Sequence, residues 1–360
     1  MRRSAIAGVL LLVTTLLLGG GSVSAQTPLV LERPSVLSAK AVNAAMLAVT
    51  RAGDRLVAVG ERGIVLLSDD SGRSWRQVVT PVRVSLTTVT FVGEKKGWAA
   101  GHLGVILHTE DGGQSWVKQL DGIQAAQLVL AAAEQRAAAE PDPEKKEDLL
   151  ASAQRLVKDG PDKPFLDLCF LDAHTGFVVG AFNLIFRTTD GGVTWTPWRD
   201  RVDNPMELHF YGIQAAGKVI YIAGEQGLLL RSTDDGAHFA PLASPYEGSY
   251  FGLVTDPVGD VVIFGLRGNV YRTADEGQSW EHEKTGIAAA LSAGTRLADG
   301  KLILVSQAGD LLVSADGGRT FKRRPDGQPI PATDLVQAAD GSLVMASLRG
   351  MHREPAPNQQ

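Results

Sequence analysis

Short apolar runs that favour strand, each ending in a small residue, recur along the chain and are separated by polar turns. They occupy residues 56–60, 97–101, 176–180, 220–224, 261–265, 302–306 and 343–347. Apolar runs bounded by glycine, aspartate and other turn residues are typical of short β-strands. Glycine numbers 40 of 360 residues, which fits many tight turns. The pattern predicts an all-β chain built from seven similar units.

An octapeptide with the pattern Ser/Thr-x-Asp-x-Gly-x-Ser/Thr-Trp/Phe follows each of the first six runs. Its copies begin at residues 68, 109, 188, 232, 273 and 314, with spacings of 41, 79, 44, 41 and 41. The spacing of 79 is one period of 41 plus an insertion of 38, and the seventh unit has no copy. A fixed period of this length is the signature of a repeat architecture.

The fixed residues of the octapeptide have a structural explanation. Aspartate accepts hydrogen bonds from turn amides, glycine adopts positive φ, and the aromatic ring fills the slot beside the next strand. A carbohydrate or metal site at each copy is the alternative, and the turn chemistry makes it unnecessary. The residues concerned are Asp70, Gly72, Trp75, Asp111, Gly113, Trp116, Asp190, Gly192, Trp195, Asp234, Gly236, Phe239, Asp275, Gly277, Trp280, Asp316, Gly318 and Phe321.

Each unit divides into four strands, which we call A to D in chain order. In the second unit they are 86–92, 97–101, 105–109 and 115–120. Four short strands at a period near 40 predict a seven-bladed β-propeller, over residues 26–354. The seventh unit supplies only three strands. We therefore expect residues 28–32 to pair beside 343–349 and complete its sheet, and we expect residues 355–360 to be a disordered tail.

Residues 121–160 interrupt the repeat between the second and third units. Alanine-rich segments surround Pro141-Asp142-Pro143, which predicts a helical hairpin over 124–139 and 143–158, with Asp142 capping the second helix. Two interpretations remain open. The hairpin is either a loop packed on the propeller or a device for binding a partner.

The N-terminus has the pattern of a signal peptide. Two arginines precede an apolar run, and Val23 and Ala25 suit cleavage after residue 25. The apolar run is too short for the alternative, an uncleaved membrane anchor, and no cysteine nearby supports lipid attachment. We expect a periplasmic or secreted protein. The net charge of −5 argues against nucleic-acid binding, and a single cysteine excludes an intramolecular disulfide.

Several units join a Gly-Trp-Ala-x-Gly-like strand to the octapeptide, as in Gly97-Trp98-Ala99-Ala100-Gly101 followed by the copy that begins at Thr109. This combination resembles the photosystem II stability/assembly factor family and its relatives in non-photosynthetic bacteria. The resemblance implies a non-catalytic propeller that holds membrane-protein subunits during assembly. It suggests a protein partner in the envelope or membrane, an exporter among the options, and a monomer at most peripheral to the membrane. The chain departs from the photosynthetic members in its scattered arginines and its insertion.

An octapeptide-bearing glycoside hydrolase of the sialidase kind, or a lyase, is the alternative function. A sialidase needs an arginine triad and a tyrosine–glutamate pair, but the Arg-Ile-Pro motif of such enzymes is absent here. The seven histidines show no metal-binding spacing. We therefore expect no catalytic residue, no metal and no cofactor.

The connections between strands predict which face binds a partner. In a blade that runs from A to D, the B–C and D–A connections share one face, while the octapeptides lie on the other. The first face carries varied polar residues, arginines and surplus aromatic residues, which are typical of interface anchors; ordinary solvated loops are the alternative. The candidate residues are Arg62, His102, Trp198, Arg199, Arg201, Tyr246, Tyr250, Arg267 and Arg349.

Overall fold

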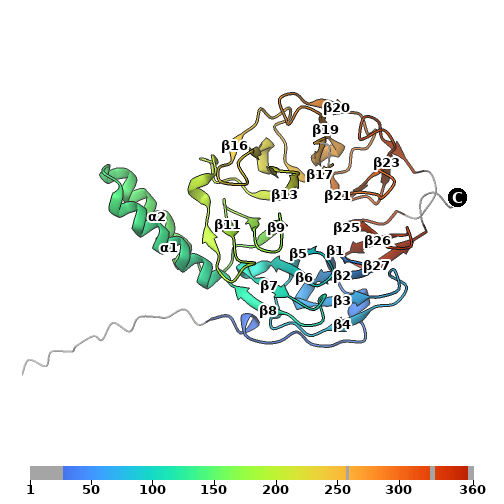
Figure 1. Cartoon of the computed structure of the whole chain (residues 1–360), viewed down its shortest axis with the longest axis horizontal. Coiled ribbons are helices and arrows are strands. Elements are labelled where there is room, and N and C mark those ends of the chain that lie inside the picture. The colour runs from blue at the N-terminus through green and yellow to red at the C-terminus, as the bar shows by residue number, and fades with distance from the viewer. Residues whose placement is uncertain (1–26, 257–258, 325–328, 356–360) are drawn as a thin grey trace, which may run out of the picture.

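A computed structural model describes residues 27–256, 259–324 and 329–355. Seven antiparallel sheets stand side by side in a ring around a central opening, and a helical hairpin projects from the ring (Figure 1). The predicted all-β, seven-bladed propeller is confirmed. The predicted signal peptide at 1–25, and residues 356–360 of the predicted tail, lie outside the described residues.

The second blade shows how each sheet is built. Strands β5 (Leu86–Val92), β6 (Lys96–Gly101), β7 (Ile106–Thr109) and β8 (Val117–Leu120) follow one another in sheet order. These bounds agree with the predicted strands to within two residues. A register shift between Leu86 and Thr88 marks a bulge at the start of β5.

The same order repeats in the other blades. The first contains β1 (Met46–Ala52), β2 (Arg55–Gly60), β3 (Val65–Ser68) and β4 (Arg76–Val78). The third and fourth contain β9 (Phe165–Phe170), β10 (Gly176–Gly180), β11 (Ile185–Thr188), β12 (Thr196–Pro197), β13 (Phe210–Ala216), β14 (Val219–Gly224), β15 (Leu229–Ser232) and β16 (Ala240–Pro241). The fifth and sixth contain β17 (Tyr250–Thr255), β18 (Val261–Gly265), β19 (Val270–Thr273), β20 (Glu281–Glu283), β21 (Leu291–Arg296), β22 (Leu302–Ser306), β23 (Leu311–Ser314) and β24 (Lys322–Arg323).

The hydrophobic core lies between neighbouring blades. Each B strand is almost wholly buried, because its two faces meet the blades on either side. The aromatic residue of each octapeptide inserts between its own blade and the preceding one, so Trp116 packs with Val57 and Leu67 of the first blade. Six of the seven clusters contain such a ring, from Trp75, Trp116, Trp195, Phe239, Trp280 and Phe321.

The seventh sheet has three strands within the described residues: β25 (Ala332–Gln337), β26 (Leu343–Ser347) and β27 (Gly350–Glu354). The predicted pairing of residues 28–32 with this sheet is wrong. That segment contains the 3-10 helix η1 (Leu29–Leu31), and the amide of Arg83 donates to the carbonyl of Val30 at 2.8 Å. The segment therefore covers the connection between the first two blades, which satisfies backbone groups there instead of at the last blade.

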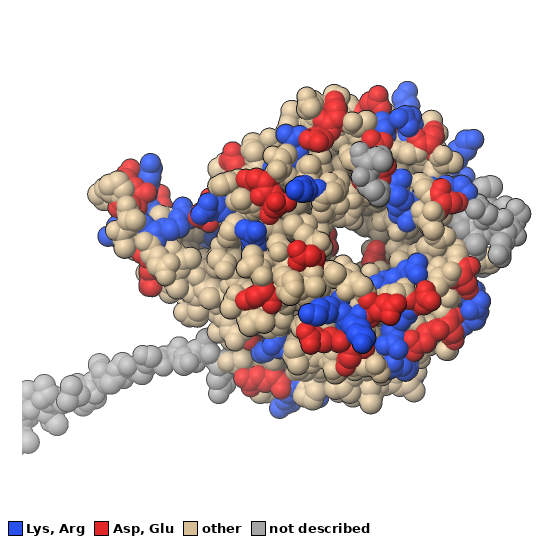
Figure 2. Space-filling model, in the orientation of Figure 1, with Lys and Arg blue, Asp and Glu red and all other residues tan. Residues whose placement is uncertain are grey.

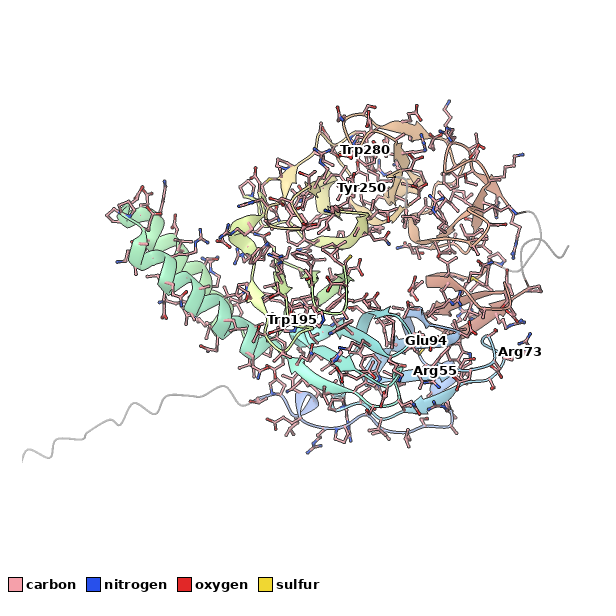
Figure 3. The ribbon with its side chains drawn as sticks, in the orientation of Figure 1. Arg55, Arg73, Glu94, Trp195, Tyr250 and Trp280 are labelled. Atoms are coloured by element: carbon pink, nitrogen blue, oxygen red, sulfur yellow. The ribbon has the colours of Figure 1, made fainter. Side chains whose placement is uncertain are left out.

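Contacts between side chains and the backbone close the ring. The amide of Val49 donates to Oδ2 of Asp334 at 2.9 Å, and Oγ1 of Thr333 donates to the carbonyl of Met46 at 2.8 Å. On the octapeptide side, Arg73 and Asp340 form an ion pair at 2.7 Å, and Figure 3 places Arg73 at the rim of the ring beside the last blade. Closure thus joins the first and last blades without a shared sheet.

The insertion is the predicted helical hairpin. Helix α1 (Gly122–Ala139) starts at a capping box in which Asp121 accepts from the amides of Ile123 and Gln124. Asp142 caps α2 (Pro143–Asp159), as expected. Alanines buried along α1 allow the two helices to pack closely. None of the helices in the described residues is both long and apolar enough to cross a bilayer.

Candidate interaction face

The connections divide between two faces as the strand order requires. Thr80, in the connection that follows β4, donates its hydroxyl to the carbonyl of Gly63 in the B–C turn of the same blade, at 2.7 Å. On the opposite side, Gly112 of an octapeptide donates its amide to the carbonyl of Lys95 in an A–B turn, at 2.9 Å. We call the side with the B–C turns and D–A connections the connection face, and the side with the octapeptides the box face.

The B–C turns hold bulky side chains in an unusual backbone conformation. A residue other than glycine has positive φ in five of these turns, a conformation that costs roughly 1–2 kcal/mol for an L-residue. Among the turns, η3 (Glu61–Gly63), η4 (His102–Gly104), η6 (Glu225–Gly227) and η7 (Leu266–Gly268) share one geometry. The residues with φ between 50° and 58° are Arg62, Leu103, Phe182, Gln226 and Arg267.

This geometry presents several of the central side chains to solvent. The side chain of Arg62 is 84% exposed, and Phe182 is 50% exposed. Arg267, Arg349 and His102 are also exposed. Within the described part of the chain, the side chains of Arg267 and Arg349 form no ion pair. The connection face therefore displays cations that are free to meet an acidic or polar partner.

Three of the candidate residues come together after β12. Arg199 pairs with Glu207, and Arg201 lies 3.2 Å from Nε2 of His238. The guanidinium of Arg201 stacks 5.6 Å from the ring centre of Trp198. All three residues line a groove whose other wall is formed by the helical hairpin.

Trp198 has a packing role that the sequence analysis did not assign. Its Nε1 donates to the carbonyl of Gly236 in the next octapeptide at 2.8 Å, and its ring packs with Phe177 and other residues between the third and fourth blades. Gln119 occupies the same position in the second blade and binds the carbonyl of Gly191. Trp198 is therefore half-buried between blades and is not a free surface anchor.

The aromatic pair on the connection between the fourth and fifth blades is only partly at the surface. Tyr250 is fully buried, which corrects its assignment as an exposed anchor. It begins β17 and occupies the repeat position of Phe165 and Phe210, whose rings fill the space between blades. Burial raises the pKa of Tyr250 to about 12. Tyr246 is half-buried, with its ring 6.1 Å from that of Tyr271.

A groove of about 760 Å³ lies between the hairpin and the connection that follows β12. Figure 2 shows it as a notch beside the ring, with Lys and Arg atoms along its sides. Small side chains of the two helices, such as Ala132 and Ser152, form one wall, and Trp198 and Pro205 form the other. Arg136 and Lys145, together with Glu140 and Asp148, give the helical side charges of both signs.

The octapeptides use their polar groups within the turn. Oδ1 of Asp70 accepts from the hydroxyl of Ser68 at 2.8 Å and from the amide of Ser74 at 2.9 Å, while Oδ2 accepts from the hydroxyl of Ser74 at 2.6 Å. These hydrogen bonds, that from the Ser74 hydroxyl foremost, lower the pKa of Asp70 to about 2. Ser68 also accepts from the amide of Gly72. The structural interpretation of the motif accounts for every fixed residue.

The A strands line a central channel of about 470 Å³. Asp167 accepts from the amide of Ile213 and the hydroxyl of Thr88, one on each neighbouring blade, and Asp334 accepts from Val49 in the same way. Burial raises the pKa of Asp167 to about 6 and that of Asp334 to about 7. These carboxyl groups join neighbouring blades around the channel. The described residues contain no group of three or more His, Cys, Asp or Glu side chains placed to hold a metal ion.

Several exposed apolar residues on the connection face were not among the predicted site residues. The sequence places Phe182, Leu266 and Leu348 in B–C turns, but an apolar residue in a turn gives no sign there of how exposed its side chain is. Leu348 and Leu266 directly precede the exposed arginines of their turns. The residues and their exposed fractions are Phe182 (50%), Met206 (68%), Leu266 (37%) and Leu348 (66%).

Comparison with known proteins finds similarity to photosystem II assembly factors. The Photosystem II assembly lipoprotein Ycf48 of Synechococcus sp. (strain CC9902) is 35% identical over 151 residues, which are 39% of this chain and 43% of that protein. The Photosystem II stability/assembly factor HCF136 of Arabidopsis thaliana is 27% identical over 139 residues, 37% of this chain and 34% of that protein. The aligned part thus spans less than half of the length of these relatives.

Solved structures share the fold. A YCF48 bound to a D1 peptide matches with a TM-score of 0.63 and 17% identity, over 88% of this chain and 95% of that one. A GH74 enzyme of Niastella koreensis matches with a TM-score of 0.59 and 15% identity, over 88% of this chain and 44% of that one. At such identities the likeness concerns the fold alone.

The profile of one family aligns with most of the repeat. It matches residues 53–122 and 149–321, well over half of the chain, and passes over α1 and the start of α2. The match includes all six octapeptides. The chain therefore belongs to the family described as Photosynthesis system II assembly factor YCF48.

Proposed function

We propose that this protein is an exported, non-catalytic assembly factor that binds a polypeptide segment of an envelope or membrane protein complex through its connection face. One observation carries the proposal. The B–C turns hold large side chains outward in a costly backbone conformation, at equivalent positions of several blades. Strained residues that recur at equivalent turns are a reason to expect function there. Three octapeptides on the box face also contain such residues, Ser71, Asp235 and Glu276, but the polar groups of those turns bond to one another within the turn.

The chemistry of the two faces supports this choice. The box face uses its carboxylates within its own turns. The connection face offers Arg62, Arg267 and Arg349, together with the apolar Phe182 and Leu348. Cations next to exposed apolar groups favour a partner segment with both acidic and apolar side chains.

The relatives support a role in assembly. Those with significant similarity are named for photosystem II assembly, and one YCF48 has been solved with a D1 peptide bound. We extend to this chain only the general role, the binding of a polypeptide during assembly of a complex. The partner here is a protein of the envelope or membrane, and an exporter is one such partner.

The absence of catalysis is part of the proposal. The GH74 enzymes share the propeller fold, but a fold hosts many functions. Glycoside hydrolysis requires a pair of carboxyl groups free to act on the sugar. Asp167 and Asp334, the acidic residues of the channel, both accept hydrogen bonds from the backbone of neighbouring blades. The purified protein should not hydrolyse sialosides or aryl glycosides.

A charge reversal with a matched control tests the face. The first variant combines Arg62→Glu, Arg267→Glu and Arg349→Glu on the connection face. The control combines Lys95→Glu, Lys218→Glu and Arg319→Glu, which make the same change of charge at exposed positions of the box face.

The assay is capture of membrane proteins from detergent-solubilised envelopes, with the captured protein identified and its binding then measured with purified components. We expect the connection-face variant to bind at least about tenfold more weakly and the control to bind like the unmodified protein. The same loss in both variants, or loss in the control alone, contradicts the proposal.

Export rests on the sequence pattern at residues 1–25. Cleavage after Ala25 predicts a mature chain that begins at Gln26. The intact mass of the protein recovered from the envelope fraction tests this. A mass that includes the first 25 residues contradicts cleavage.

A further inference from the structure

Within the described residues, the last blade has three strands, whereas each of the other six has four. Its described sheet ends at β27, whereas every other blade has a fourth strand after its octapeptide. We propose that an extended, aromatic-bearing segment of the partner polypeptide adds to β27 as the fourth strand of this blade. This inference rests on the proposed function, since it requires a polypeptide partner, and it names a second place where that partner docks.

The register of the repeat defines the backbone groups involved. In the first blade, Val65 and Leu67 of the C strand pair with Val78 and Arg76 of the D strand. The pairing of Val59 with Val65 corresponds to the pairing of Ala346 with Met351 in the last blade. Met351 therefore matches Val65, and Arg353 matches Leu67.

These groups point away from the sheet. A two-residue turn joins β26 to β27, with Ser347 paired to Gly350, so the residues bonded to β26 alternate from Gly350 onward. The amides and carbonyls of Met351 and Arg353 consequently face the vacant position. Among the described residues, no further backbone hydrogen bond reaches Met351 or Arg353. In the third blade, the corresponding carbonyl of Ile185 accepts from the amide of Trp198 at 2.9 Å.

The exposure of β27 also indicates that no strand covers its outer edge in the described residues. The C strands β3 and β19 are buried at every residue, but four of the five residues of β27 are partly or fully exposed. The strand lies at the rim of the ring (Figure 1). The short helix η2 (Ala41–Asn43) packs beside Gly350 at one end of β27. An exposed edge of this kind pairs readily with another extended chain.

The hydrophobic clusters indicate the chemistry of the missing strand. Each of the other six clusters receives the aromatic ring that directly precedes a D strand. The cluster between the sixth and seventh blades, which includes Leu297, Leu311 and Met345, contains no aromatic residue. A segment that completes the repeat therefore carries Trp, Phe or Tyr just before a stretch that runs antiparallel to β27.

The sequence points to a partner as the source of this segment. The parts of the sequence outside the described residues, at 1–26, 257–258, 325–328 and 356–360, contain no Phe, Trp or Tyr. None of them can place a ring in the cluster between the last two blades. We therefore assign the aromatic segment to another polypeptide, which gains backbone hydrogen bonds from the edge and specificity from the ring.

A peptide that copies a D strand of this protein tests the site. The probe has the sequence of residues 277–285, which includes Trp280 and β20, and its control replaces that tryptophan with alanine. Binding is measured by calorimetry with the purified full chain. We expect one peptide per chain, and binding at least about tenfold weaker for the alanine control. No binding up to about 1 mM peptide, or equal binding of the two peptides, overturns the proposal.

Matched variants at Arg353 identify the edge itself. Arg353→Pro removes the outward amide, while Arg353→Ala keeps it, and both remove the ion pair with Asp340. We expect the proline variant alone to lose the peptide. Equal binding by the two variants contradicts strand addition. A chain ending at Glu354 should bind like the full chain, and binding that appears only after this truncation would mean that the tail, not a partner, occupies the edge.

The two proposals fail in different ways. The charge-reversed connection face should leave the probe peptide bound, because the arginines concerned lie on turns rather than on β27. If the captured partner binds Arg353→Pro as well as it binds Arg353→Ala, strand addition is wrong while the proposed function stands. If no polypeptide partner exists, the proposed function fails even where the probe peptide binds.

Discussion

In the five blades whose B strand ends in glycine, that end lies unusually close to the start of the A strand. Substitution of Gly101 tests how much stability depends on this approach. A Cβ atom built on Gly101 lies 2.7 Å from Cα of Leu86 and 3.0 Å from the carbonyl carbon of Ser85, and closer still to the Ser85 oxygen. That oxygen accepts the amide of His102 at 2.9 Å, which fixes the B–C turn. In Gly101→Ala the two strands must move apart at the bulge.

Two effects determine how much Gly101→Ala should destabilise the protein. Overpacking of a tight core costs about 1–3 kcal/mol, and the strained hydrogen bond adds about 1 kcal/mol. We therefore expect Gly101→Ala to lower the free energy of unfolding by about 2–4 kcal/mol. Gly93 is the control, because its φ is +73° but nothing lies within 4 Å of a built Cβ. Gly93→Ala should cost only the conformational penalty, about 1–2 kcal/mol.

Urea denaturation of the two variants, followed by tryptophan fluorescence, measures the difference. The reasoning is refuted if Gly101→Ala is no less stable than Gly93→Ala, since close approach would then have no measurable cost.

Three further predictions concern stability. Asp111→Ala removes the acceptor for the amide and hydroxyl of Ser115 and should lower the free energy of unfolding by about 1–2 kcal/mol, with no loss of partner binding; a binding defect in the folded variant contradicts this. Trp198→Ala should lower the free energy of unfolding by about 2–4 kcal/mol, measured by thermal denaturation. An unchanged melting temperature would contradict the packing role of Trp198 between blades. In the folded chain, burial raises the pKa of Asp167 to about 6 and that of Asp334 to about 7, above the pKa of an aspartate in an unfolded chain, so the free energy of unfolding should fall as pH rises from about 4 to about 7. Replacing both residues with asparagine should flatten this slope. An unaltered slope in denaturation series between pH 4 and 8 contradicts the assignment.

The repeat made most of the fold predictable from the sequence. Glycine and aspartate at fixed offsets bound each strand, so the strand bounds of the second blade and both helices of the insertion were predicted to within two residues. Asp142 and Pro143 fixed the start of α2, because a capping side chain and a proline at the first position act locally. Elements whose ends depend on such local interactions can be predicted from a single sequence.

The errors arose where tertiary contacts override local pattern. The apolar Leu29–Leu31 has the composition of a strand, yet its carbonyls meet Arg83 and Lys118 and it forms a 3-10 turn. Tyr250 follows an irregular connection, so its place at the start of an A strand was not recognised. Trp198 lies three residues after Trp195, an offset shared with Gln119 after Trp116, but the two side chains differ so much that the shared position is not evident from residue type.

The groove beside the hairpin was beyond sequence reasoning, because its two walls come from separate elements. The sequence predicted both the hairpin and the arginines after β12, but not that they face each other. Which residues oppose one another across a groove depends on the angle at which the hairpin leaves the ring. That angle is set by packing of α1 against the neighbouring blades.

Closure by side chains has a kinetic consequence for the molecule. The bonds that join Val49 to Asp334 and Thr333 to Met46 link residues 285 and 287 positions apart. The bond from Thr255 to Ala215, between the fifth and fourth blades, spans only 40 positions, and the bond from Thr88 to Asp167, across the insertion, spans 79. Contacts of such long range bear the largest loop-closure entropy, so they form after the local sheets. During synthesis, the apolar face of the first blade that packs against the last blade therefore stays exposed until the last blade has been made. The interval in which that face is open is the period when the chain is most exposed to aggregation and to chaperones.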